Sequence, residues 1–132
     1  LKIRIKEIEK NAIDLANELV KNNKVKKVYH PALKDHPNHR IWKRDFTGSS
    51  GLFTFELNKK YSINILENFC KKLKIFKIGY SWGGSESLIT FPTITKRKHK
   101  ENLKGSLVRV YCGHEDSKDQ IKDIVDALRI LK

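Results

Sequence analysis

The sequence predicts a mixed α/β (α+β-like) fold in which a mainly antiparallel sheet carries its helices on one face. Two observations lead to this class. Helical and strand-like periods follow one another in the order α-β-β-α-β-β-β-α. The 132 residues, 39% of them hydrophobic, are enough to build one buried core. No internal repeat divides the chain, so we expect residues 1–132 to form a single domain.

The first half of the chain supplies a long helix and two strands. Apolar residues three and four positions apart predict an amphipathic helix over residues 3–22. They are Ile5, Ile8, Ala12, Leu15 and Leu19. Val25 and Val28 alternate with lysines in a short strand. Residues 30–50 hold two prolines and no period, which predicts a long loop with room for one helical turn. Large apolar residues alternate over Gly51–Leu57, as in a half-buried strand.

A second helix and three more strands follow. Ser62 can cap the helix, whose core-facing residues should be Ile63, Leu66, Phe69, Cys70 and Leu73. Strands are predicted over residues 75–80, 87–91 and 107–112. A basic loop over residues 92–105 joins the last two of them.

The chain closes with a third amphipathic helix. Asp116 or Ser117 can cap it, and Gln120 fits a capping box that begins at Ser117. Its expected buried stripe is Ile121, Ile124, Val125 and Leu128. The carboxylates of Glu115 and Asp116 favour the N-terminus of this helix electrostatically, which is a sufficient structural reason for them.

The net charge of +13 raises the question of nucleic-acid binding. Of the 28 basic residues, 22 are lysines spread over the whole chain, as on a tolerant, solvated surface. The one dense cluster, residues 96–100 (KRKHK), contains no aromatic residue on which a base could stack. Nucleic acid is therefore an unfavoured partner.

Composition also bears on compartment and metal binding. No stretch is long and apolar enough to span a membrane and the chain does not begin with a signal peptide, so we expect a cytoplasmic protein with no membrane partner. Cys70 and Cys112 have no metal-site spacing and are expected to be reduced core thiols. The loop histidines His30, His36 and His39 lack ligand-spaced carboxylates or cysteines, so no metal site is expected.

One charge stands out, because Arg109 lies inside the predicted strand LVRVYC. A strand arginine between valines must be paired or must face a polar cavity. Two structural explanations stay open: an edge strand with Arg109 in solvent, or an ion pair with Glu86. The functional alternative is a fixed guanidinium fork for the carboxylate of a ligand.

A second unusual stretch is YSWGG, residues 80–84. A glycine pair allows a sharp turn or a close approach of the backbone to a ligand. Trp82 beside that pair is either a buried plug or the wall of a pocket.

Three segments, in this order and spacing, resemble the C-terminal domain of the bacterial cystathionine beta-lyases. The segments are HPALKDHPNHRIWKRDFTGSSGLFTFEL, YSWGGSESLITFP and LVRVYCGHEDSKDQIKDIVDAL. Those enzymes belong to the pyridoxal-phosphate-dependent Cys/Met metabolism family. The resemblance covers essentially all 132 residues. It implies the small C-terminal domain of a fold-type I enzyme that splits cystathionine into homocysteine, pyruvate and ammonia, a transsulfuration step of methionine biosynthesis.

The resemblance also implies roles for three residues. Arg109 matches the arginine that binds the substrate α-carboxylate, and Ser81 matches the serine that supports both. Trp82 matches the residue whose backbone N–H and ring help to set carboxylate contact and specificity, where related gamma enzymes typically carry Leu. Two positions depart from the family: Ser85, where a larger aromatic residue is usual, and His114, where an aliphatic one is usual.

The chain lacks what the family's catalysis requires. The resemblance implies a large N-terminal domain with a Schiff-base lysine and a phosphate cradle, and neither is found here. Thr95-Lys96 superficially matches the lysine motif but lacks its continuation, so Lys96 is interpreted as a surface residue. We therefore expect a C-terminal substrate-side part with no catalytic residue and no cofactor of its own, inactive in isolation.

Partners and the competing function follow from this resemblance. The complete enzyme is expected to be a homo-oligomer in which pyridoxal phosphate is held by the N-terminal domain and an amino acid is the substrate. The alternative is a stand-alone basic α/β module that binds an acidic partner such as nucleic acid.

Overall fold

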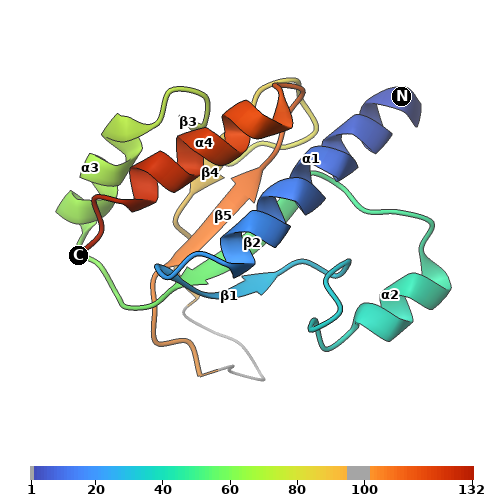
Figure 1. Cartoon of the computed structure of the whole chain (residues 1–132), viewed down its shortest axis with the longest axis horizontal. Helices are drawn as coiled ribbons and strands as arrows, with labels where there is room; N and C mark the ends of the chain where they lie inside the picture. The colour runs from blue at the N-terminus through green and yellow to red at the C-terminus, as the bar shows by residue number, and fades with distance from the viewer. Residues whose placement is uncertain (1, 95–101) are drawn as a thin grey trace.

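The computed structural model describes residues 2–94 and 102–132 (Figure 1). The element order agrees with the prediction, with one addition: a seven-residue helix in the loop over residues 30–50. In chain order the elements are α1 (Lys2–Val20), β1 (Val25–Tyr29), α2 (His39–Asp45), β2 (Leu52–Leu57), α3 (Ile63–Lys72), β3 (Lys77–Ile78), β4 (Leu88–Thr90), β5 (Leu107–Tyr111) and α4 (Ser117–Leu128).

The strands form one five-stranded sheet in the order β1-β2-β5-β4-β3. Its pairs are antiparallel except for the β3–β4 pair at one edge, which is parallel. The last strand in sequence, β5, is therefore central: Arg109 lies opposite Thr54 of β2 on one side and opposite Thr90 of β4 on the other. The predicted mainly antiparallel sheet is confirmed.

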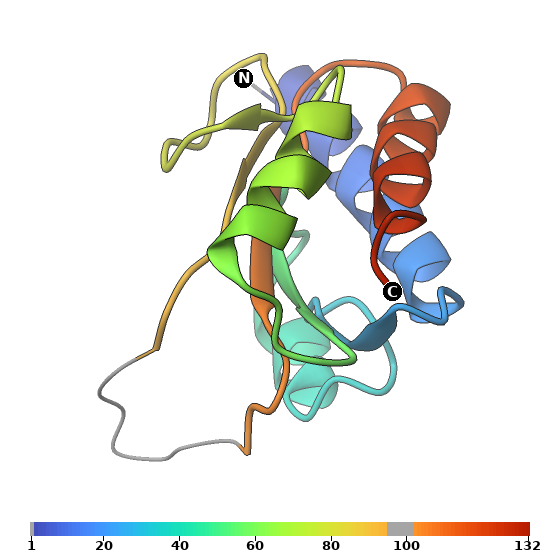
Figure 2. The ribbon, with the colours of Figure 1, turned by 90° about the vertical axis from the view of Figure 1, so that its left-hand side faces the viewer.

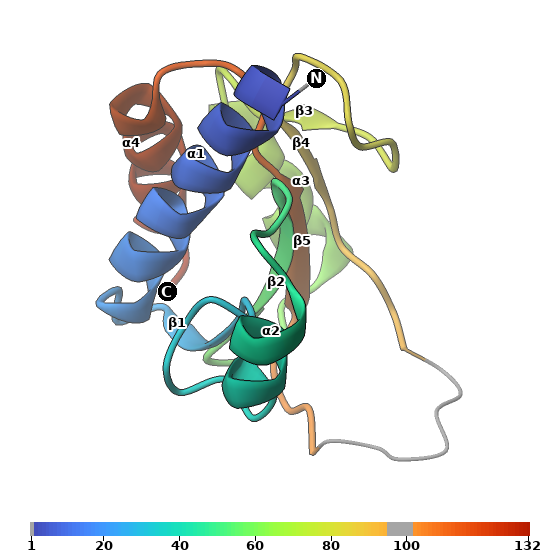
Figure 3. The ribbon, with the colours of Figure 1, turned by 90° about the vertical axis from the view of Figure 1, so that its right-hand side faces the viewer.

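The long helices lie on one face of the sheet, as predicted. Helices α1 and α4 pack against each other, and α3 packs against α4. Figures 2 and 3 show them on the same side of the strands, whereas the loop between β3 and β4 stands away on the other side. We call the side without these helices the open face.

Strand alternation divides the residues of β2 and β5 between the two faces. The inward residues of β5, Val108 and Val110, are fully buried in the core beneath the helices. The alternate residues of β5 therefore point to the open face, and these include Arg109 and Tyr111. The core also takes the inward residues of β2, which are Phe53, Phe55 and Leu57. Cys112 is buried and Cys70 is partly buried, and the two thiols are unbonded.

Two strands are shorter than the predicted ranges 75–80 and 87–91, since β3 has two residues and β4 has three. The carboxylate of Asp123 in α4 accepts three backbone N–H groups just before β3. They belong to Lys74, Ile75 and Phe76, at 2.7, 2.9 and 3.0 Å. This contact fixes α4 against the start of β3.

The predicted helix ends are only partly right. Asp116 caps α4, its side chain accepting the Lys118 N–H at 2.8 Å. The capping box from Ser117 to Gln120 is wrong, since Gln120 is buried and donates to other groups. In α3, Leu66 and Phe69 face the core as expected, but Ile63 is exposed because it lies in the first turn, beyond the edge of the core.

Burial of His30 makes the stability of the fold depend on pH. The ring is fully buried, stacks edge-on against Phe53 with 5.5 Å between centroids, and has no partner for Nε2 among the described residues. Burial lowers the pKa of His30 from 6.5 to about 4. The unfolded chain therefore takes up this proton first as the pH falls.

We expect the free energy of unfolding to fall by about 1 kcal/mol between about pH 7.5 and about pH 5.5, because that window spans the unfolded pKa of 6.5 and stays above the folded pKa of about 4. In His30→Gln, which cannot gain the proton, this loss should largely disappear. Urea unfolding at both pH values measures it. An identical pH dependence in the variant would show that His30 does not carry the effect.

Candidate functional site

A pocket of about 740 Å³ lies on the open face of the sheet. Arg109, Thr54 and Tyr29 come to it from three neighbouring strands, β5, β2 and β1. Its other lining residues are His36, Leu52, Phe53, Pro92, Ile94, Leu103 and Leu107. Among the described residues, Arg109 is the one arginine or lysine that lines this pocket, and the combination of apolar walls with a cation suits an organic anion.

The structure supports neither of the two structural explanations for Arg109 that the sequence left open. Its strand is central in the sheet, so it is not an edge residue in solvent. Glu86 forms its ion pair with Lys77 instead. Within residues 2–94 and 102–132, no carboxylate lies within ion-pair distance of Arg109, and one guanidinium nitrogen donates to the Tyr80 carbonyl at 3.1 Å.

This hydrogen bond brings the two stretches singled out in the sequence to one place. Tyr80 is the first residue of YSWGG, so Ser81 and Trp82 follow directly on the carbonyl that Arg109 holds. Trp82 is 64% exposed and is not a buried plug. Gly83 has a φ of 86°, in the left-handed region that favours glycine, which explains one residue of the glycine pair. The Trp82 ring is therefore presented on the surface by a sharp turn.

The far end of this turn is fixed by Ser87 and Glu115. The Glu115 carboxylate accepts the Ser87 N–H at 2.8 Å and the Ser87 hydroxyl at 2.7 Å. Ser87 Oγ in turn accepts the Gly113 N–H at 2.8 Å and the Gln120 amide at 3.1 Å. Burial alone would raise the pKa of Glu115, but the hydrogen bonds it accepts, from Ser87 first and also from Gln120, together leave this pKa below its usual value.

Helix α1 supports the same network from the core side. The amide of Asn11 is buried and donates to the carbonyls of Gly113 and Glu115, at 3.0 Å each. A Cβ at position 113 would collide with the Ser85 carbonyl, so the chain passes there only as glycine. Residues 85–87 are thus held against residues 113–115 by several hydrogen bonds.

Sequence reasoning missed this network. Glu115 was assigned to the helix N-terminus, whereas its carboxylate binds Ser87 and Gln120. One signal was present: Gln120 stands one position before the apolar stripe of α4, on a side of the helix that the three-to-four spacing also turns inward. A polar residue there requires buried partners.

The pocket fits a carboxylate better than it fits pyridoxal phosphate itself. A Schiff base requires a lysine, and no lysine lines the pocket among the residues that the structure describes. Thr95-Lys96 and the basic cluster 96–100 lie outside those residues. The Arg109 guanidinium lies on the strand between Thr54 and Thr90. Its N–H groups can donate hydrogen bonds to a carboxylate.

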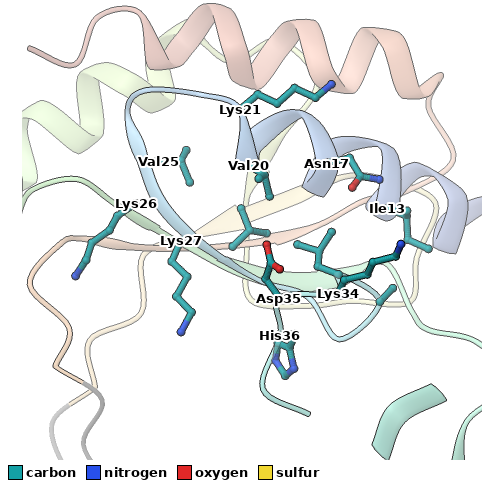
Figure 4. Close-up of a pocket in the computed structure, with 13 residues that line it drawn as sticks. Ile13, Asn17, Val20, Lys21, Val25, Lys26, Lys27, Lys34, Asp35 and His36 are labelled. Carbon is teal, nitrogen blue, oxygen red and sulfur yellow. The ribbon is translucent and has the colours of Figure 1, made fainter. Parts of the chain in front are cut away.

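A second hollow, of about 730 Å³, lies between α1, β1 and residues 32–36 (Figure 4). It is rimmed by Lys21, Lys26, Lys27 and Lys34. Figure 4 shows Lys21 pointing away from Lys26 and Lys27, so the lysines do not converge on one point. This arrangement is typical of a solvated surface rather than of an anion site.

Two features are absent from the described residues. No helix within them has the length and apolar character needed to cross a membrane. No group of three or more His, Cys, Asp or Glu residues is placed there to hold a metal ion.

Comparison with known proteins connects this geometry to a family. The model of the family described as Cys/Met metabolism PLP-dependent enzyme matches residues 1–129. An L-alanine/L-glutamate racemase of Wolbachia pipientis is 41% identical over 130 residues, covering 95% of this chain and 32% of the relative. Cystathionine beta-lyases of Haemophilus influenzae and Escherichia coli are 40% and 37% identical, each over 94% of this chain and 33% of their own length.

A solved structure shares the fold. The putative O-acetylhomoserine (thiol)-lyase of Campylobacter jejuni, which carries a pyridoxyl-lysine, superposes with a TM-score of 0.80 at 30% identity. The match covers 97% of this chain and 29% of that one. This chain spans about a third of the length of the curated relatives it matches. Its sheet and helices are those of a fold-type I pyridoxal-phosphate enzyme, and the chain belongs to the Cys/Met metabolism family of PLP-dependent enzymes.

Proposed function

We propose that this chain is the C-terminal, substrate-side domain of a PLP-dependent carbon–sulfur lyase, with cystathionine as its substrate. The observation that carries the proposal is Arg109: a guanidinium fixed in the central strand, facing a pocket, with no carboxylate partner among the described residues. The beta-lyase relatives, at 37 and 40% identity over nearly the whole chain, support cystathionine.

Arg109 would bind the α-carboxylate of the substrate. The Tyr80 carbonyl occupies one guanidinium nitrogen and orients the plane of the fork. The remaining N–H groups are then free to donate two parallel hydrogen bonds to a carboxylate, at about 2.7–2.9 Å. Holding the carboxylate at one end fixes the direction of the Cα–H bond, which is how binding energy is used to orient a reacting group.

Ser81 and Trp82 would complete the carboxylate site. Both are exposed in the turn that begins at the carbonyl held by Arg109. The Ser81 hydroxyl can donate to the bound carboxylate, and the Trp82 backbone N–H can donate beside it. The Trp82 ring would form a wall that restricts the length of the substrate side chain. No catalytic base is assigned to this chain.

Pyridoxal phosphate supplies the electron-withdrawing group that makes the substrate α-proton acidic. We propose that it is held by an N-terminal domain of the complete protein, together with the Schiff-base lysine, and that the complete protein is a homo-oligomer. On this proposal the 132-residue chain alone orients the substrate and has no lyase activity.

A second candidate is amino-acid racemisation. The Wolbachia relative, named an L-alanine/L-glutamate racemase, is 41% identical to this chain. Racemisation and β-elimination both start from removal of the α-proton, so both would use Arg109 in the same way. They differ in the step that follows, since β-elimination also breaks the bond from Cβ of the substrate to sulfur. The stand-alone nucleic-acid module has less support, because its basic cluster 96–100 carries no aromatic residue.

One assay separates the two candidates. The complete PLP-containing protein is offered L-cystathionine and, separately, L-alanine and L-glutamate. A lyase releases pyruvate and a thiol from cystathionine, whereas a racemase produces the D-amino acid and no thiol. The proposal expects a higher kcat/KM for cystathionine than for either amino acid. Rapid formation of D-alanine or D-glutamate without thiol release would favour the second candidate.

Arg109→Lys keeps the charge and loses the fork. In the complete enzyme we expect kcat/KM for the amino-acid substrate to fall at least about tenfold, about 1.4 kcal/mol of transition-state stabilisation. The matched control is Arg44→Lys, which alters an exposed arginine paired with Asp45 and should leave kcat/KM unchanged. Steady-state kinetics and thermal unfolding are measured on both variants.

The two measurements together decide the role of Arg109. A loss of kcat/KM with nearly normal thermal stability supports the carboxylate site. A loss of stability with normal kcat/KM would reduce Arg109 to a structural residue that holds the Tyr80 carbonyl.

A further inference from the structure

We infer that Tyr111 is a positioning residue, whose hydroxyl holds the turn that carries Ser81 and Trp82 at a fixed place relative to Arg109. The effect of Tyr111 on substrate binding rests on the proposed function. The fixing of the turn by the Tyr111 hydroxyl rests on the structure alone, so the two claims can be tested separately.

The Tyr111 hydroxyl donates to the Gly84 carbonyl at 2.9 Å. Tyr111 is only 3% exposed although it points to the open face, because β2 and β4 flank it: it lies opposite Leu52 and Leu88. Burial raises the pKa of Tyr111, so the hydroxyl stays protonated as a donor through neutral pH. A side chain fixed in the central strand thus reaches the tip of an exposed turn.

Little else holds the middle of that turn. Trp82 is 64% exposed and Tyr80 is 74% exposed, so burial fixes neither side chain strongly. Within residues 2–94 and 102–132, no atom beyond the glycine itself and its chain neighbours lies within 4 Å of the point where a Cβ of Gly83 or Gly84 would stand. Glycine also gives the backbone more freedom than any other residue. Without anchors, the segment would sample many conformations.

Two anchors of the same kind bracket Trp82. Arg109 holds the Tyr80 carbonyl before it, and Tyr111 holds the Gly84 carbonyl after it. The two donors are same-face neighbours on β5, because residues two apart on a strand point the same way. The spacing between the guanidinium and the Trp82 ring is therefore set by one strand of the sheet.

This arrangement assigns Tyr111 an effect on substrate binding without substrate contact. If the Gly84 carbonyl is released, Trp82 and Ser81 lose their fixed position, while Arg109 and its strand are unchanged. Ordering the turn would then have to occur on binding, which weakens binding of the substrate. A change in KM larger than the change in kcat is the expected signature.

The first test uses the full chain and needs no enzymatic activity. Tyr111→Phe removes only the hydroxyl. The His114 N–H donates to the neighbouring Ser85 carbonyl at 2.8 Å, so its hydrogen-exchange rate reports on the turn. We expect this rate to rise about fivefold, and the heteronuclear NOE of the Trp82 indole N–H to fall.

Tyr61→Phe is the matched control. Its hydroxyl also donates to a backbone carbonyl, that of Lys132 at 3.2 Å, away from the turn. After normalisation to the slowest-exchanging core amides, this variant should leave the His114 exchange rate and the Trp82 NOE unchanged. Equal behaviour of Tyr111→Phe and Tyr61→Phe would overturn the inference.

The second test uses the complete PLP-containing enzyme. Tyr111→Phe should raise KM for the amino-acid substrate about fivefold and change kcat less than about twofold, whereas Tyr61→Phe should change neither. An unchanged KM in Tyr111→Phe would overturn the link to substrate binding. Failure of the proposed function is a separate result, because it would show as normal kcat/KM in Arg109→Lys while the turn in Tyr111→Phe is still loosened.

Discussion

The structure depends above all on the central position of β5 between β2 and β4. Hydrogen bonding on both sides fixes the direction of every side chain along it. Val108 and Val110 therefore point into the core under the helices, and Arg109 and Tyr111 point to the open face. Arg109 thus projects from the middle of the sheet and not from its edge. One strand therefore stabilises the core and supplies the fixed cation of the pocket.

The same strand and the loop after it determine the shape of residues 80–87. Carbonyls of Tyr80, Gly84 and Ser85 each accept a hydrogen bond from residues 109–114, and Ser87 is held by Glu115. The segment carries an exposed tryptophan and a glycine pair, which would not keep one conformation by themselves. Its order is supplied by a partner segment that is itself anchored in the core, through Asn11 and Gln120.

The fold was largely predictable because periodicity reports burial directly. The alternation of Phe53, Phe55 and Leu57 needed no tertiary information and is confirmed. The predicted stripe of α1 is confirmed from Ile8 to Leu19, whereas Ile5 is exposed. The predicted lengths of β3 and β4 were wrong. Just before β3, the Phe76 N–H binds the Asp123 carboxylate, which lies 47 residues away in sequence. The periodicity of a short sequence segment does not reveal a hydrogen-bond partner so far away in the chain.

The candidate site was predictable only in part. Arg109 could be singled out because the sequence alone shows a charged residue inside an apolar strand. The sequence indicated only that a sheet could bring Arg109 close to the YSWGG stretch. The strand order and the hydrogen bond from Arg109 to the Tyr80 carbonyl show that they are close. The roles of Tyr111 and Glu115 were not predictable, since each acts on a carbonyl or hydroxyl that lies 27 or 28 residues away. The most direct test is a crystal structure of the complete PLP-containing protein with a bound, unreactive amino-acid analogue. Our account predicts the analogue's α-carboxylate at about 2.7–2.9 Å from two nitrogens of Arg109, beside Ser81 and Trp82. A carboxylate bound to another cation, with Arg109 contacting only the Tyr80 carbonyl, would contradict it.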